Sequence, residues 1–141
     1  MDIMTRFSNA QDITVDVVSD IVLSFGSDAA RNVFFRGDRL LKIKVTTTFA
    51  TLTEGIRVEF RFDTEAGLAS GSEIVIADSG ILLPANLTEK DLYQVMISPR
   101  SLPSGYDFCG VFYNVVSTAA TAGAFTTWLA DGPEVAGNVD S

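Results

Sequence analysis

The sequence predicts an all-β protein: an antiparallel two-sheet sandwich, for which a jelly roll fits best. About eight segments alternate apolar and polar residues with a period of two, the spacing of a strand that has one buried face. Glycine and proline punctuate the chain between these segments. Helical periodicity is nearly absent, so the chain has no place for the crossover helices that a parallel sheet needs.

The clearest strand lies at 56–63, where the letters IRVEFRFD alternate without a fault. We expect its apolar residues to face the core and its charged residues to form a solvated ladder, with a cation beside each acid. The segment 41–49 alternates in the same way, and 51–55 is short enough for a hairpin loop. Residues 40–63 are therefore predicted to form two adjacent antiparallel strands.

The remaining segments are shorter or more apolar. The segment 108–116 is apolar on both faces, as a central strand covered on both sides is. The one helical signal is a single turn at 87–92, where Thr88 and Asp91 have the spacing of a cap. Further strands are expected at 13–17, 21–25, 73–77, 81–83, 93–97 and 125–130.

Composition divides the chain into three parts. Residues 1–12 carry large apolar side chains among polar ones, which a disordered tail seldom keeps, and are predicted to form an extended N-terminal arm. Residues 13–131 form the predicted sandwich domain. Residues 132–141, with glycine, proline and acids, are predicted to form a flexible C-terminal tail.

The chain contains no histidine, which argues against most enzymes. Histidine is the usual general base near neutral pH and the commonest metal ligand. A glycosidase-like carboxylate pair is available in Glu59 and Asp63, but Arg57 and Arg61 accompany them, so a surface ladder explains these acids better. Asp16 and the other acids lack the spacing of a calcium loop. We expect no catalytic residue, no cofactor and no metal.

Charge and hydropathy narrow the range of partners. The chain carries 18 acidic against 10 basic residues, a formal charge of −8, which argues against nucleic acid. No apolar run approaches the roughly 18 residues that span a bilayer, so no membrane partner is expected. The single cysteine, Cys109, lies in an apolar run and is expected to be buried and inert.

The opening residues, MDIMTRFSNAQ, resemble the N-terminus of the capsid cement proteins of short-tailed bacteriophages, the type found on Bordetella phage heads. The segments at 78–80, 112–115 and 121–126 resemble later parts of that family in order and spacing. Two features depart from it. The segment 105–109 is more apolar and acidic than the arginine-containing family segment, and the chain continues past the usual end at 132–141.

The resemblance implies a jelly roll, usually a homodimer, that sits outside an icosahedral shell and bridges neighbouring capsomers without catalysis. We therefore expect the major capsid protein as partner, no small-molecule substrate, synthesis in the host cytoplasm and a place on the capsid exterior. Met4 and Phe7 are predicted as apolar anchors on the capsid and Arg6 as a polar clamp. In the alternative, Ile3, Met4 and Phe7 fold back and cover their own sandwich.

The main rival function is a carbohydrate-binding β-sandwich for adhesion to a host surface, and an enzyme is a distant third. Aromatic side chains stack on sugar rings, although in strands they more often belong to a core or an interface. The residues that could stack in this way are Trp128, Tyr93, Tyr106 and Tyr113.

Overall fold

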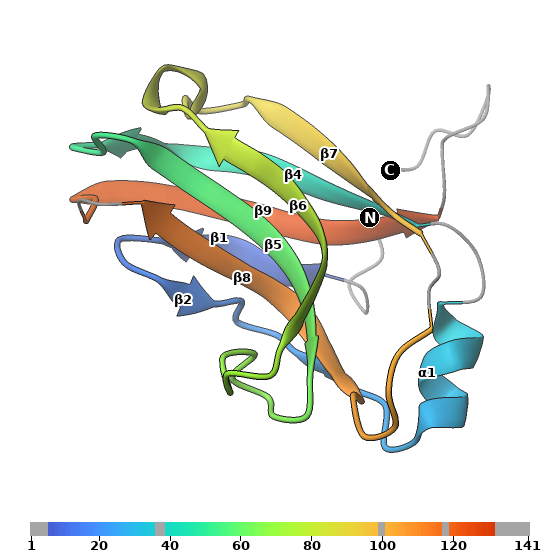
Figure 1. Ribbon diagram of the computed structural model, residues 1–141. Helices are drawn as coiled ribbons and strands as arrows, with labels where there is room; N and C mark the ends of the chain where they lie inside the picture. The colour runs from blue at the N-terminus through green and yellow to red at the C-terminus, as the bar shows by residue number, and fades with distance from the viewer. Residues whose placement is uncertain (1–5, 36–38, 99–100, 117–118, 132–141) are drawn as a thin grey trace.

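The structure is a computed structural model that describes residues 6–35, 39–98, 101–116 and 119–131. Two antiparallel sheets pack against each other, which confirms the predicted all-β sandwich (Figure 1). Sheet A has the strand order β1-β9-β4-β7, and sheet B has the order β2-β8-β5-β6 with β3 also paired to β8. The strands are β1 (Arg6–Asp12), β2 (Val17–Val18), β3 (Leu23–Ser24), β4 (Arg39–Ala50), β5 (Gly55–Asp63), β6 (Ile74–Leu82), β7 (Leu92–Ile97), β8 (Phe108–Val116) and β9 (Ala122–Asp131).

The pairing of the strands is nested from the ends of the chain inward. β1 pairs with β9, β2 and β3 pair with β8, β4 pairs with β7, and β5 pairs with β6. The pairings β4–β9 and β5–β8 join these hairpin-like pairs into the two sheets. A long antiparallel hairpin rolled up in this way is a jelly roll, with β2 and β3 together filling one strand position.

The core lies between the sheets and is rich in aromatic side chains. Phe60 packs edge-on against Phe7, with ring centroids 5.7 Å apart. Tyr113 is fully buried, and its hydroxyl lies 2.7 Å from both the Ser8 and the Thr127 hydroxyls. This buried polar network ties β1, β8 and β9 together, and it is satisfied at every member, as a polar group inside a core must be.

The predicted arm is wrong for residues 6–12, which form the edge strand β1 of sheet A. The physical reason is Phe7, whose side chain is completely buried in the inter-sheet core. The first strand predicted at 13–17 is accordingly displaced: Ile13 follows β1, and within 13–17 only Val17 belongs to a strand, β2, which pairs with β8. Met4 and the predicted tail 132–141 lie outside the described residues.

The predicted hairpin of residues 40–63 is also wrong. β4 belongs to sheet A and β5 to sheet B, so the loop between them crosses from one sheet to the other. Both strands alternate as predicted, but their apolar faces oppose each other across the core rather than lying side by side in one sheet. Alternation reports which face of a strand is buried and not which strand is its neighbour.

The two strands predicted at 73–77 and 81–83 are one strand, β6, interrupted by a bulge. The ladder to β5 shifts register near Asp78, and Gly80 has a φ of +69°. The bulge leaves the Val58 N–H without a backbone acceptor on β6. The Ser79 hydroxyl accepts a hydrogen bond from this N–H at 3.1 Å instead.

A helix that the periodicity did not predict, α1 (Asp28–Phe34), packs at one end of the sandwich (Figure 1). The Ser27 hydroxyl caps it by accepting the Ala30 N–H at 3.1 Å. Arg31 is 3% exposed and donates to the backbone carbonyls of Pro103 and Tyr106, which fastens α1 to the loop before β8.

The segment after β6 contains the short 3-10 helix η2 (Pro84–Asn86) and a turn closed by Thr88 and Asp91. Thr88 donates from its N–H and its hydroxyl to the Asp91 carboxylate at 3.1 and 2.7 Å, so the predicted pair closes a turn, although it is not helical. No helix in the described ranges is long and apolar enough to cross a membrane.

Candidate functional site

The outer face of sheet A carries two exposed large apolar side chains, Leu92 and Met96. On each strand of sheet A, outward-facing residues alternate with inward-facing ones. The inward-facing residues, such as Leu41, Ile43 and Val95, pack in the core. The ladder then places the outward residues in rows across the sheet. We call these positions the A face: Arg6 on β1, Thr126, Trp128 and Ala130 on β9, Leu40, Lys42 and Lys44 on β4, and Leu92, Gln94 and Met96 on β7.

The central row of the A face brings together an aromatic ring, two cations and an amide. Arg6 lies opposite Trp128, Trp128 opposite Lys42, and Lys42 opposite Gln94. The Lys42 ammonium donates to the Gln94 carbonyl at 2.9 Å, so one neutral partner holds this charge in place. Trp128 is half-buried, which leaves part of its ring available on the surface.

The two ends of the A face differ in accessibility. Leu92 and Met96 on β7 are 57% and 45% exposed, unusually open for large apolar side chains in a strand. Toward β1 the surface closes: Thr126 is buried, and its hydroxyl accepts the Ala10 N–H at 2.9 Å. The accessible part therefore runs from the central row to the β7 edge.

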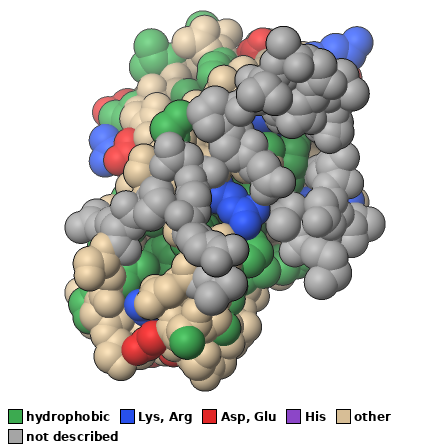
Figure 2. Space-filling view, turned by 90° about the vertical axis from the view of Figure 1, so that its right-hand side faces the viewer, with side chains coloured by type: hydrophobic (Ala, Val, Ile, Leu, Met, Phe, Trp, Pro, Cys, Tyr) green, Lys and Arg blue, Asp and Glu red, His purple; other side chains and the backbone are tan. Residues whose placement is uncertain are grey.

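The A face is cationic on a strongly acidic chain. Its described positions include Arg6, Lys42 and Lys44 and no acidic residue, whereas the whole chain carries −8. Figure 2 shows a different surface, the α1 end of the sandwich, where a basic group lies among hydrophobic side chains and acidic groups lie toward the margins. A cationic and apolar face of this kind favours a partner that carries carboxylates.

The structure places the two described members of the predicted capsid-contact set, Arg6 and Phe7, on opposite sides of β1. Arg6 lies on the A face, with its Nε buried and without a hydrogen-bond partner among the described residues. Phe7 points the opposite way and is 0% exposed, which agrees with the alternative in which it covers its own sandwich. Met4 lies outside the described residues. Of the two described residues, Phe7 therefore packs in the core, and Arg6 lies on the side that a partner can contact.

The outer face of sheet B, which we call the B face, contrasts with the A face. It comprises the outward residues of β5, β6 and β8. The predicted solvated ladder on it is wrong, because Glu59 is 6% and Asp63 is 0% exposed. Arg61 donates to the Glu59 carboxylate from Nε at 2.8 Å and Nη2 at 2.5 Å, and it lies over the Phe112 ring.

The loop 64–73 covers part of the B face. Leu68 is fully buried there, and its carbonyl accepts a hydrogen bond from Arg61 Nη1 at 2.7 Å. The Leu68 side chain fits there because residue 110 on β8 is glycine: a Cβ at this position would lie 3.2 Å from Leu68. β8 is thus covered on both faces, as its double-sided apolar sequence predicts.

Asp63 anchors the same loop. Its carboxylate accepts the Ser70 hydroxyl at 2.6 Å and the N–H groups of Thr64 and Ser70 at 2.6 and 3.1 Å. Burial alone would raise the pKa of Asp63, but these hydrogen bonds outweigh it and lower the pKa below its usual value. A carboxylate held ionised by its loop suits a structural role better than that of a general acid.

The aromatic residues considered for sugar stacking are mostly engaged elsewhere. Tyr113 is buried, and burial raises its pKa far above the usual value. Tyr93 donates its hydroxyl to the Asn86 carbonyl, and Tyr106 donates to the Ser72 carbonyl at 2.8 Å. Among these four residues, Trp128 alone lies in a row with outward-facing polar groups.

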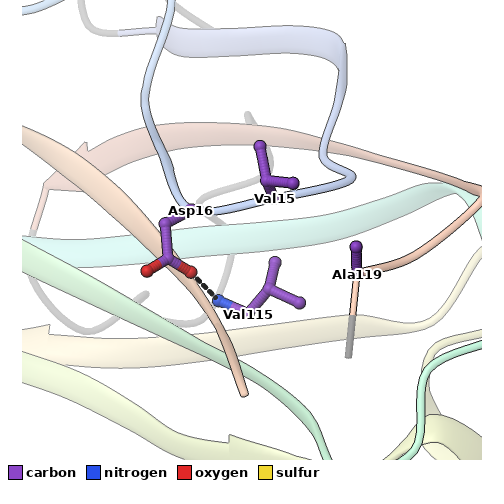
Figure 3. Close-up of a pocket in the computed structure, with 4 residues that line it drawn as sticks. All are labelled: Val15, Asp16, Val115 and Ala119. Atoms are coloured by element: carbon purple, nitrogen blue, oxygen red, sulfur yellow. Dashed lines mark hydrogen bonds between the residues drawn. The ribbon is translucent and has the colours of Figure 1, made fainter. Parts of the chain in front are cut away.

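A shallow pocket of about 350 Å³ lies where the β1–β2 loop meets the end of β8 (Figure 3). Val15, Val115 and Ala119 line it with apolar side chains, and Asp16 supplies its one charged side chain. One oxygen of Asp16 accepts the Val115 N–H at 2.8 Å, so the carboxylate fixes the loop to β8. A ligand site usually has several polar groups that point at the ligand, whereas the one polar side chain here is already bonded to the backbone.

Cys109 is buried, and burial raises the pKa of its thiol well above the usual value, as an inert core cysteine requires. The described residues contain no group of three or more potential metal-ligating side chains. Asp16 and Asp63 instead serve as acceptors for backbone N–H groups.

The sequence did not single out the row Lys42, Trp128 and Gln94. Alternation alone would place each of them on the outer side of a strand. Their adjacency depends on the register of β4 with β7 and β9, which are distant in the chain. In comparisons with known proteins, no protein-family model and no curated protein matches the chain.

Proposed function

We propose that the protein is a structural, non-enzymatic virion subunit that binds the outer surface of an icosahedral phage capsid and cements neighbouring capsomers. The observation that carries the proposal is the A face, a partly exposed surface that combines cationic and apolar side chains on an acidic chain. The predicted homodimer and the capsid-exterior location belong to the same proposal.

The proposal assigns different tasks to the two sides of sheet A. The buried side holds the sandwich together through residues such as Phe7 and Ile43. The A face supplies a surface on which a partner can bury apolar area around Trp128 and Leu92 while its carboxylates meet Lys42. A contact of about 800 Å² per partner suffices for a specific complex. Two such contacts in a dimer would strengthen attachment by avidity.

The test is sedimentation with assembled shells of the phage that encodes the chain. Wild-type protein should sediment with shells to a saturable occupancy and raise the temperature at which they burst. The Arg6→Ala variant should bind more weakly while its unfolding curve stays close to that of the wild type. Deleting residues 1–11 is less informative, because it would remove most of β1. Wild-type protein that stays in the supernatant would refute the proposal.

A second candidate is the carbohydrate-binding module for host adhesion. Trp128 favours it, because a half-buried ring beside Lys42 and Arg6 offers a stacking surface with polar neighbours. A glycan array separates the two functions. Saturable binding to one glycan that is lost in Trp128→Ala would support adhesion, and binding to shells alone would support cementing.

A further inference from the structure

The sandwich has four strand edges, and one of them lacks the features that normally protect an edge. Unprotected edges pair with strands of other molecules, and natural proteins block them with bulges, charges or short strands. The edge β1 has two register shifts and a residue with positive φ, Ala10. The edge β6 has its bulge near Asp78. At the fourth position, β2 and β3 are two residues each.

The edge β7 is regular and uncharged. Its sequence, LYQVMI, contains no charged residue, proline or glycine, and its ladder with β4 runs without a register shift. Tyr93, Val95 and Ile97 are of types that favour strands, and Leu92 and Met96 are exposed apolar side chains. In the described part of the chain, β7 is therefore the edge best suited to accept another strand.

The backbone groups that such a strand would use can be identified. The Val45 N–H donates to the Asp91 carbonyl at 2.9 Å, in register with the β4–β7 ladder. Backbone groups alternate between the two sides of an antiparallel strand. Odd-numbered residues of β7 therefore bond to β4, whereas the N–H and C=O groups of Leu92, Gln94 and Met96 face the open edge.

The charges beside this edge indicate what the incoming strand carries. Lys42 and Lys44 lie one strand in from β7, opposite Gln94 and Leu92. Neighbouring strands lie about 4.8 Å apart, and β7 would lie between β4 and an added strand. A lysine side chain on β4 and a glutamate side chain on the added strand can together span that distance. A second copy of β7 would bring no carboxylate, because LYQVMI contains none.

We propose that β7 accepts an extended, acid-bearing segment of the shell protein as a fifth strand of sheet A. Main-chain hydrogen bonds to Leu92, Gln94 and Met96 would supply affinity, and outward carboxylates near Lys42 and Lys44 would supply selectivity. The proposal rests on the proposed function, since the strand comes from the shell that the protein cements.

The decisive variant is Gln94→Pro, with Gln94→Thr as its matched control. Proline removes the N–H that faces the open edge and leaves the ladder to β4 intact, the setting in which an edge strand tolerates it. Threonine changes the side chain but keeps the N–H. Each variant is sedimented with assembled shells after its thermal unfolding has been compared with that of the wild type. If Gln94→Pro does not fold, Met96→Pro replaces it, because the Met96 N–H faces the same edge.

Hydrogen exchange of wild-type protein, free and shell-bound, supplies the second readout. We expect exchange in the 92–97 segment to slow by at least about tenfold on shells. We expect Gln94→Pro to bind at least about tenfold more weakly than Gln94→Thr, because both variants lose the amide side chain and only the proline variant also loses the N–H.

Three results would overturn the proposal, and they are distinguishable. If wild-type protein sediments with shells while exchange at 92–97 and binding of Gln94→Pro are unchanged, the strand proposal fails and the proposed function stands. If wild-type protein does not sediment at all, the proposed function itself fails. If free protein is a dimer that Gln94→Pro dissociates, a second copy and not the shell protein occupies the edge.

Discussion

Both outer faces of the sandwich carry cations at positions that alternate with core residues, but they use these cations differently. On the B face, Arg61 pairs with Glu59 and donates to the Leu68 carbonyl, so its guanidinium is bound to groups of its own chain. On the A face, Lys42 meets only the neutral amide of Gln94 among the described contacts, and Leu92 is left exposed. Charged residues that alternate with apolar ones can therefore serve either stability or binding. The difference lies in whether a loop covers them.

The largest effect is expected at the boundary between the A face and the core. Phe7→Ala should lower the free energy of unfolding by about 4 kcal/mol, because it removes a fully buried aromatic ring. Arg6→Ala, one residue away on the A face, should change it by less than about 1 kcal/mol. Urea unfolding measures both. A nearly neutral Phe7→Ala that nonetheless abolishes shell binding would restore Phe7 as a capsid anchor and contradict the structure.

Removing the cation from the B face should be nearly as damaging. Arg61→Ala should destabilise the protein by about 3 kcal/mol, because the buried Glu59 carboxylate loses its charge partner. The matched control is the double variant Glu59→Gln/Arg61→Met, which removes both charges and should recover part of that loss. If Arg61→Ala were as mild as a surface substitution, the B face would be open to solvent after all.

Asp63 adds a dependence on pH to the B face. Its pKa is lowered in the folded state, so its stabilisation is complete above the ordinary pKa near 3.8 and is lost as pH falls below that value. Asp63→Asn should cost about 2 kcal/mol at pH 7 through lost charge-assisted hydrogen bonds. The gap between wild type and variant should narrow between pH 4 and pH 2. Urea titrations across this range check the sign, and a gap that widens in acid would contradict it.

The smallest effect on stability is expected on the A face. Lys42→Glu should change the free energy of unfolding by no more than about 0.5 kcal/mol, because Lys42 is only half-buried and bonds only to Gln94 among the described residues. Chemical denaturation at low and high salt checks this. A loss comparable with that of Arg61→Ala would mean that the A face, too, is part of the stabilising framework.

Local patterns predicted the faces of the strands well and their neighbours poorly. The alternation in β5 identified Ile56, Val58, Phe60 and Phe62 as core residues, which the structure confirms. It did not show that β4 lies in the other sheet, because jelly-roll pairing joins strands far apart in the chain. Nor did it show the covering of Glu59, which depends on a loop that folds back over the sheet.

Short elements escaped prediction for a different reason. α1 has seven residues, too few for periodicity to register, although Ser27 before Asp28 is a capping signal that could have marked its start. The sequence predicts an arm at β1 because polar residues interrupt the alternation there. The two register shifts of β1 also change which residues face the core. Arg6 and Trp128 could both be named from the sequence, as a capsid contact and as a stacking residue, but their adjacency required the β1–β9 register.

The central claim, that the A face binds the shell, is tested most directly by the equilibrium occupancy of assembled shells for two variants of equal net charge. Lys42→Glu changes the A face, and Val75→Glu/Ile81→Glu adds the same negative charge at exposed positions of β6 on sheet B. We predict that Lys42→Glu loses at least about tenfold in affinity, about 1.4 kcal/mol, and that the β6 variant binds as the wild type does. Equal losses, or a loss confined to the β6 variant, would contradict the account.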